Sequence, residues 1–135
     1  MVIQLPDLVR SFLMRPNPAV MATLAKDGRP VTVATWYLLE PSGEVLLNLD
    51  AERLRLQHLR RDPRIALTVL DEADWYSHVS LQLSVVTVAD DPELADIDSL
   101  SKHYTGAPYS DRERPRVSAR AEILRWHGWG EFAER

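Results

Sequence analysis

Apolar residues occur at helical spacing at the start of the chain and in strand-like runs after it. In residues 6–14 the apolar positions recur every three or four residues until two prolines interrupt the pattern, which predicts a short helix. Residues 19–24 and 30–39 are rich in β-branched and apolar side chains, and the Asp-Gly pair between them is a strong hairpin signal. We therefore expect a helix followed by two antiparallel strands.

The middle of the chain predicts one more strand and an arginine-rich helix. A turn containing Pro, Ser and Gly precedes the strand, which covers residues 45–48. Asp50 is a suitable N-cap for a helix over residues 51–61, and this segment contains no helix breaker before Asp62 and Pro63. The helix is expected to end there.

The last part of the chain predicts three strands and one helix. Residues 64–70 and 79–89 are apolar, β-branched runs separated by an acidic loop, and the second predicted strand is long. Asp91 is expected to cap a helix from residue 92 to about residue 103. Residues 117–126 alternate in polarity like a final strand.

These elements favour a mainly β fold with minor helical content. Roughly six strands, joined mostly by hairpins and interrupted by short helices, indicate an antiparallel barrel with helices at its ends. A chain of 135 residues has the length of a single domain, so we expect one folding unit over residues 1–135.

Charge and composition exclude several functional classes. The net charge is −4, with 16 Lys and Arg against 20 Asp and Glu, which gives no long-range attraction to nucleic acids or anionic lipids. No apolar run approaches the roughly 20 residues of a membrane span. The first apolar stretch contains Asp7 and does not read as a signal peptide. We expect a cytoplasmic protein without nucleic-acid or membrane partners.

The chain lacks the residues that most self-sufficient catalysts use. Cysteine is absent, which excludes thiolate nucleophiles and cysteine-bound zinc, and no serine-nucleophile or phosphate-loop motif occurs. The four histidines fall on different predicted elements, so we expect no metal site. If the protein is an enzyme, a cofactor is expected to supply the reactive atom.

The most informative polar feature is a pair of arginines at the start of the predicted second helix. Arg53 and Arg55 combine guanidinium donors with the free amides of a helix N-terminus, an arrangement that suits a phosphate group. The alternative is a solvent-exposed basic helix, in which the remaining cations Arg60, Arg61 and Arg64 are balanced by neighbouring acids. The spacing alone leaves both interpretations open.

Aromatic residues are the second feature. Three tryptophans fall at predicted strand ends, where they would enclose a planar ligand or pack in a core or dimer interface: Trp36, Trp75 and Trp126. For Tyr37, Tyr76 and Trp129 the packing interpretation is preferred. The segment 104–109 contains Gly and Pro that end a helix, and we interpret it as mainly structural.

Seven short motifs occur in an order typical of one family. They are Asp-Gly-Arg-Pro at 27–30, Thr-Trp-Tyr at 35–37, Leu-Asn at 47–48, Arg-x-Arg at 53–55, Leu-Arg-Arg-Asp-Pro-Arg at 59–64, Tyr-Thr-Gly at 104–106 and Arg-Trp-His-Gly at 125–128. From about residue 19 to residue 129 the chain resembles the pyridoxamine-phosphate-oxidase-like split-barrel family. Within it, the chain resembles the small reductases that depend on the deazaflavin coenzyme F420.

The resemblance implies a six-stranded antiparallel split β-barrel that forms a homodimer with two flavin-type sites at the subunit interface. Carried over by position, Arg53 and Arg55 would hold the cofactor phosphate. Four residues would line the ring system, largely through backbone amides: Val33, Thr35, Leu47 and Asn48. Three residues would approach the same ring from the other subunit: Trp75, His78 and Trp126.

The activity implied is hydride transfer between F420 and a small conjugated organic substrate. The alternatives are an FMN-dependent oxidase of the same fold and a non-enzymatic protein that binds a flavin or a tetrapyrrole. A third interpretation, an inert interaction scaffold, requires no cofactor at all. The catalytic residues are not identified, and His78, Tyr37 and solvent are the candidate proton donors.

The chain departs from the family in its long strand. Members usually have a Gly followed by a basic residue where this chain has Leu83 and Ser84. Because Leu lacks the conformational freedom of Gly, we expect a β-bulge to be absent there and the partner side of the pocket to be altered.

Overall fold

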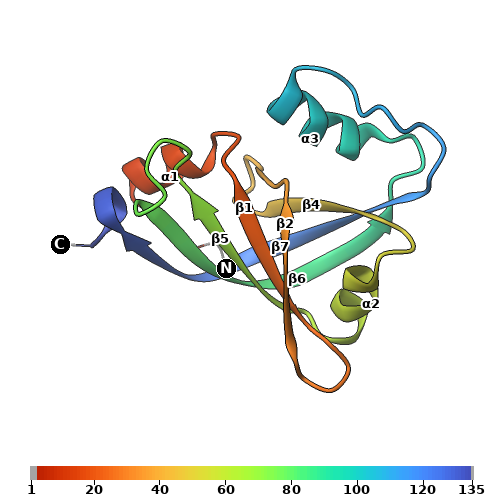
Figure 1. Cartoon of the computed structure of the whole chain (residues 1–135), viewed down its shortest axis with the longest axis horizontal. Helices are drawn as coiled ribbons and strands as arrows, with labels where there is room; N and C mark the ends of the chain where they lie inside the picture. Colours follow the sequence, from red (N-terminus) through yellow and green to blue (C-terminus); the bar gives the residue numbers. More distant parts are fainter. Residues whose placement is uncertain (1–2, 135) are drawn as a thin grey trace.

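Seven strands and four helical segments make up the computed structural model, which describes residues 3–134 (Figure 1). In chain order they are α1 (Asp7–Leu13), β1 (Ala19–Leu24), β2 (Pro30–Thr35), β3 (Leu38–Leu39), β4 (Val45–Asp50), α2 (Leu54–Arg61), β5 (Arg64–Leu70), β6 (His78–Asp90), α3 (Ala95–Thr105), β7 (Arg116–Trp129) and the 3₁₀ turn η1 (Gly130–Phe132). All strand pairs are antiparallel, in the order β2-β1-β5-β6-β7-β4-β3. The predicted mainly β fold is confirmed, with seven strands in place of six.

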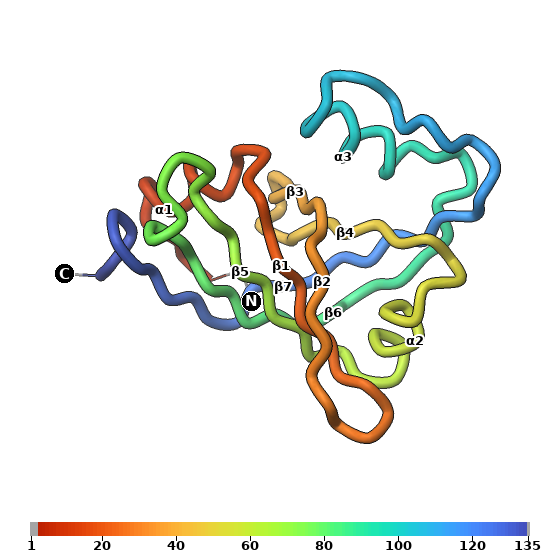
Figure 2. Tube along the Cα trace, in the orientation of Figure 1, coloured from red at the N-terminus to blue at the C-terminus, as the bar shows by residue number. Residues whose placement is uncertain are grey.

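The extra strand arises because the predicted run over residues 30–39 is broken in the middle. Its first part, β2, pairs with β1, and its second part, β3, pairs with β4 at the other edge of the sheet. Between them the side chain of Tyr37 enters the core, where its hydroxyl donates to the carbonyl of Leu13 at 2.8 Å. The Tyr37 amide donates to the Tyr104 hydroxyl at 3.3 Å. The chain thus crosses from one edge of the sheet to the other (Figure 2).

Strands β6 and β7 are the longest, and two irregularities in their pairing bend them. The register shifts between Gln82 and Leu83 and again between Val85 and Thr87. The additional residues are Leu124 on β7 and Val86 on β6, and both side chains are exposed because a bulge interrupts the alternation of faces. The expected loss of a bulge at Leu83 is therefore wrong, since the extra residue lies on β7 and needs no glycine on β6.

Both longer helices begin later than predicted. Helix α2 starts at Leu54, and Arg53 occupies the N-cap position with extended backbone. The Asp50 carboxylate accepts a hydrogen bond from the Glu52 amide at 2.9 Å and forms a turn before the helix. Asp91 similarly stands four residues before α3, yet its carboxylate accepts from two amides of the first turn of α3, at 3.2 and 2.9 Å.

Two apolar clusters lie on opposite sides of β4, and they explain why all of β4 is buried. Leu47 and Leu49 face the barrel core, which is closed at its ends by α1 and α2 (Figure 1). Leu46 packs under α3 against Ile97 and Leu100. Asn48 alternates with Leu47 and shares the α3 side, so the pleat of β4 directs Asn48 away from the barrel core.

The described helices, including α3 with its 11 residues, do not have the length and apolarity that crossing a bilayer requires.

Strand β7 continues to Trp129, three residues past its predicted end, and the chain then turns at η1. There Phe132 is buried and stacks on Phe12 with ring centroids 4.2 Å apart. The end of the described chain therefore closes the barrel together with α1.

We expect Gly128→Ala to destabilise the protein by displacing this closing turn. A Cβ atom at Gly128 would lie 1.9 Å from the backbone oxygen of Phe132, so η1 must move and Phe132 must leave the core. The largest expected loss in the free energy of unfolding is the cost of deleting a buried Phe side chain, about 3–5 kcal/mol. Chemical denaturation of the single variants and of the double variant with Phe132→Ala measures the effect. Fully additive costs would contradict this account, because both changes remove the same contact.

Candidate cofactor site

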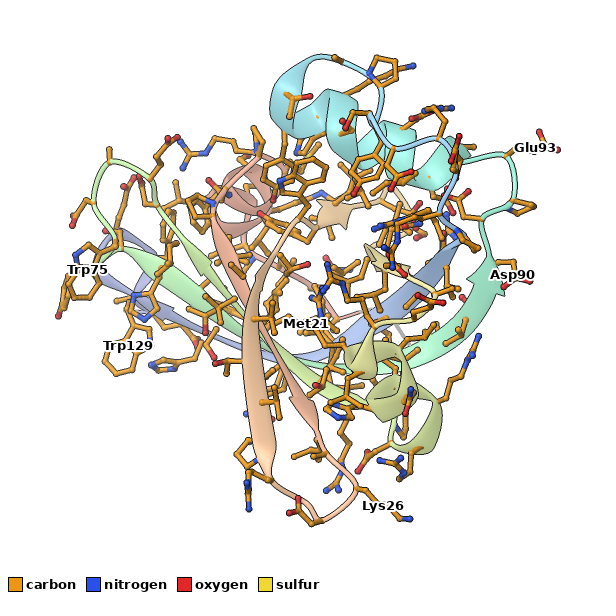
Figure 3. All side chains as sticks on the ribbon, turned by 45° about the vertical axis from the view of Figure 1, so that its right-hand side comes forward. Met21, Lys26, Trp75, Asp90, Glu93 and Trp129 are labelled. Carbon is orange, nitrogen blue, oxygen red and sulfur yellow. The ribbon has the colours of Figure 1, made fainter. Side chains whose placement is uncertain are left out.

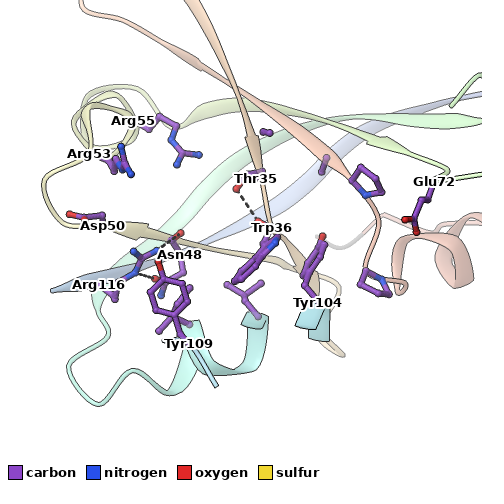
Figure 4. A pocket seen from close by; sticks show the side chains of 16 residues that line it. Thr35, Trp36, Asn48, Asp50, Arg53, Arg55, Glu72, Tyr104, Tyr109 and Arg116 are labelled. Carbon is purple, nitrogen blue, oxygen red and sulfur yellow. Dashed lines mark hydrogen bonds between the residues drawn. The ribbon is translucent and has the colours of Figure 1, made fainter. Parts of the chain in front are cut away.

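A cavity of about 790 Å³ lies where the end of β2, the strand β4, the start of α2 and the helix α3 meet (Figure 4). Its lining includes Thr35 at the end of β2 and Trp36 after it, Asn48 and Asp50 on β4, Arg53 and Arg55 at α2, Tyr104 on α3 and Tyr109 after it, and Arg116 at the start of β7. The cavity has a cationic end beside α2 and an aromatic wall beside α3. This combination suits a planar ligand that carries an anionic group.

Three guanidinium groups form the cationic end: Arg53, Arg55 and Arg116. Among the described residues none of them makes a salt bridge, and the side-chain hydrogen bond of Arg55 goes to the sulfur of Met21, at 3.8 Å. Burial lowers the pKa of Arg55, and repulsion by Arg53 and Arg116 lowers it further. Neighbouring cations without a counter-ion form a site to which an anion binds favourably.

The acid nearest to this cluster is already neutralised. Asp50 is buried and forms a salt bridge with Arg114, which lies outside the cavity lining. The hydrogen bond from the Glu52 amide, followed by the contact with Arg114, keeps the pKa of Asp50 below its usual value. Asp50 is therefore ionised at neutral pH, and its salt-bridge partner is Arg114.

Aromatic rings form the opposite wall. Trp36 and Tyr104 are stacked with centroids 5.4 Å apart and planes 13° apart, and Tyr109 meets Trp36 edge-on at 6.2 Å. The Tyr104 hydroxyl donates to the carbonyl of Asn17 at 2.8 Å, and burial raises its pKa to about 12. Tyr104 is thus a fixed, neutral wall residue at physiological pH.

Comparisons with known proteins identify the family of the chain. The family "Pyridoxamine 5'-phosphate oxidase" matches residues 5–130. The chain belongs to the pyridoxamine 5'-phosphate oxidase family. No curated protein matches the chain.

Solved structures share the fold of this pyridoxamine 5'-phosphate oxidase family member. An F420 reductase has a TM-score of 0.81 and 23% identity, with 90% of this chain and 98% of that chain covered. A conserved hypothetical protein from Mycobacterium tuberculosis has a TM-score of 0.74 and 25% identity, with 95% and 86% covered. General Stress Protein 26 from Bacillus anthracis has a TM-score of 0.66 and 10% identity, with 90% covered of both chains.

In this member of the family, four of the predicted cofactor-binding residues meet at the cavity: Thr35, Asn48, Arg53 and Arg55. Leu47 lies in the barrel core, so only its backbone is available to a ligand. Val33 shares the face of β2 that carries Thr35 and is exposed, but it lies outside the cavity lining. Ring contacts through the backbone amides of these residues remain a prediction.

The three residues predicted to approach from a partner subunit lie outside the cavity of their own chain. Trp75 is 72% exposed, and His78 stacks on Trp129 with centroids 5.8 Å apart. Figure 3 shows Trp75 and Trp129 close together, across the molecule from Asp90. Trp126 packs, partly buried, against the barrel core. Their approach to a second subunit's site remains a prediction.

Sequence reasoning missed several cavity residues. The segment 104–109 was expected to be mainly structural, but Tyr104 and Tyr109 line the cavity. The sequence did not indicate Arg116, because its partner Asn48 lies far away in the sequence, on β4. Tyr37, a candidate proton donor, is a core residue whose hydroxyl is engaged with Leu13 and Asn17, and burial raises its pKa. That candidate role is wrong for this cavity.

Proposed function

We propose that the protein is an oxidoreductase that binds the deazaflavin F420 in this cavity and reduces a small conjugated organic substrate. The observation that carries the proposal is that one cavity holds an aromatic wall and three arginines that make no salt bridge within residues 3–134. Similarity to an F420 reductase in fold, and membership of the family, support the choice of cofactor. Reduced F420, when bound, supplies a hydride.

The residues present suit a phosphorylated planar cofactor. Arg53 and Arg55 would hold the phosphate by charge-assisted hydrogen bonds, which are stronger than neutral ones. Strand β2 is an edge strand of the described sheet, where it pairs with β1, so its other edge offers backbone groups to a ring system. Trp36 and Tyr104 would limit the access of water from the α3 side. The chain would thus bind and orient the cofactor and leave the redox chemistry to it.

We also propose that the protein works as a homodimer. On the outward face of β2, β1, β5 and β6, two adjacent cross-strand rows carry small or uncharged side chains: Ala34, Val20, Thr68 and Ser80, and Thr32, Ala22, Ala66 and Gln82. All eight are half-buried or exposed, and an uncharged surface of this kind suits a second copy of the chain. Ala34 also lines the cavity, so a partner on this face would reach the site.

Titration of the purified protein with F420 and with FMN tests the choice of cofactor. We expect F420 to bind at least about tenfold more tightly than FMN, a difference of about 1.4 kcal/mol, measured by quenching of cofactor or tryptophan fluorescence. Tight binding of FMN without affinity for F420 would favour the FMN-dependent oxidase, which would use the same arginines. Binding of neither would refute the proposed function.

Turnover separates an enzyme from a protein that only stores a flavin or a tetrapyrrole. Reduced F420 is supplied with a panel of quinones and tetrapyrroles, and its oxidation is followed by absorbance. Steady turnover of at least one substrate class is the expected result. Stoichiometric binding without turnover of any member would support the non-enzymatic alternative.

A further inference from the structure

We propose that Arg116 is a third anion-binding residue of the cavity, positioned by Asn48, and that this end of the cavity takes a ligand carrying at least two negative charges. The inference deepens the proposed function and rests on it for the identity of the ligand. The requirement for a multiply charged oxyanion comes from the side chains themselves. Arg53 and Arg55 lie on the α2 side of the cavity, and Arg116 lies across from them (Figure 4).

The guanidinium of Arg116 is held in one orientation by two contacts. Its Nε donates to Oδ1 of Asn48 at 2.9 Å, and its Cζ lies 5.0 Å from the centre of the Tyr109 ring. Nη2 is 3.4 Å from the Asn48 carbonyl oxygen, a long hydrogen bond. Nη1 has no hydrogen-bond partner among residues 3–134. The side chain is therefore fixed along one edge and retains unused donors in a wall of the cavity.

Asn48 has no free side-chain donor to offer an anion, and it acts through Arg116. Its Nδ2 donates to Oδ2 of Asp91 at 3.1 Å and lies 3.0 Å from the Ser118 hydroxyl. Asp91 is itself fixed by the amides of Asp96 and Ile97. Because Nδ2 is committed to the carboxylate, Oδ1 must face Arg116. Asn48 is thus a positioning residue.

The acids around this end of the cavity are already engaged by groups other than Arg53, Arg55 and Arg116. Asp50 shares Arg114 with Glu52, and Asp96 shares Arg120 with Glu40. Asp91 is compensated by two helix amides and the Asn48 amide. Within residues 3–134, the three guanidinium groups at this end therefore have no carboxylate as a salt-bridge partner. A single negative charge leaves most of this repulsion in place, whereas a dianion or two adjacent oxyanions relieve it.

Isothermal titration calorimetry of the ligand-free full chain with inorganic pyrophosphate tests the inference without a flavin. We expect Arg116→Gln to weaken pyrophosphate binding at least about tenfold, because a hydrogen bond to a charged group contributes about 1.5–3 kcal/mol. The matched control is Arg60→Gln on the exposed side of α2, which should retain the wild-type affinity. Unchanged affinity in Arg116→Gln, or a wild type that does not bind pyrophosphate, would overturn the inference.

A double-variant cycle tests the positioning role of Asn48. Asn48→Ala should weaken pyrophosphate binding, and adding it to Arg116→Gln should cause no further loss. Losses that add in full would overturn the role of Asn48. Thermal unfolding checks each variant. If Arg116→Gln does not fold, Arg116→Lys is the second variant, because lysine keeps the positive charge but lacks the hydrogen bond from Nε to Asn48. Wild-type pyrophosphate affinity in Arg116→Lys would equally overturn the inference. Pyrophosphate binding without binding of F420 or FMN would refute the proposed function and leave the anion site in place.

Discussion

Replacing both Arg53 and Arg55 by glutamine should reduce the affinity for a phosphorylated flavin-type cofactor at least about 100-fold. Each guanidinium contributes a charge-assisted hydrogen bond of about 1.5–3 kcal/mol, and two such bonds correspond to two or more orders of magnitude. Neither arginine makes a salt bridge with a described residue, so the change leaves no carboxylate without its partner. We therefore expect binding to be lost while the fold is retained.

Fluorescence titration with F420 and FMN measures the loss, and thermal unfolding reports the fold. The matched control is Arg60→Gln with Arg61→Gln, which removes the same charge from the same helix outside the cavity lining. If the control pair loses as much affinity as Arg53 and Arg55, general electrostatics of the helix explain the binding. If the double variant at Arg53 and Arg55 binds as the wild type does, the cofactor phosphate lies elsewhere.

The second large effect is expected from Ala66→Glu, which should convert a dimer into monomers. Ala66 lies between Ala22 and Gln82 in the uncharged cross-strand rows of the outward sheet face. A twofold interface would bury one unpaired carboxylate from each copy, and each buried charge costs several kcal/mol. We expect the dissociation constant of the dimer to rise at least about 1,000-fold.

Sedimentation velocity over a range of protein concentrations measures this change. Ala95→Glu, an alanine at the exposed start of α3, adds the same charge away from the sheet face and should leave the assembly intact. A monomeric wild type, or a variant at Ala66 that still dimerises, would refute the proposed interface. If the monomeric variant also loses cofactor affinity, the partner subunit contributes to the site.

The electrostatics of the cavity are local. The chain as a whole carries a net charge of −4, yet the cavity end beside α2 is cationic. The cavity end can be cationic because neighbouring acids form salt bridges with other arginines, such as Asp50 with Arg114 and Glu40 with Arg120. The net charge therefore argues against generic binding of polyanions and is compatible with a specific site for one anionic ligand.

Local sequence signals predicted much of the secondary structure. The strands at residues 19–24 and 64–70 begin and end where the sequence pattern placed them, because turn residues and breakers bound them on both sides. The helices were found, but α2 and α3 begin three residues late. The carboxylates of Asp50 and Asp91 accept hydrogen bonds from backbone amides two and five residues further along the chain. An acidic residue before a helix therefore marks the turn that leads into the helix, but it does not fix the residue at which helical backbone begins.

The cationic pair was the part of the candidate site that the sequence itself indicated, since Arg53 and Arg55 are local to one turn and adjoin a predicted helix start. The remainder of the cavity depended on contacts between distant segments. Arg116 reaches Asn48 through the register of β4 with β7, and Tyr104 reaches Trp36 through the packing of α3. A strand register is set by the burial of whole faces, which no short window of sequence specifies.

The sequence by itself determined the alternation of strands and turns, the absence of a cysteine-based chemistry and the placement of two arginines at the start of α2. Tertiary structure alone decided that the chain breaks at Trp36 and Tyr37, that β6 and β7 bulge without a glycine, and that a third arginine and an aromatic wall complete the cavity. The reason is physical. Propensity and turn chemistry act over a few residues, whereas pairing and packing join residues that are adjacent only after the sheet has closed around its core.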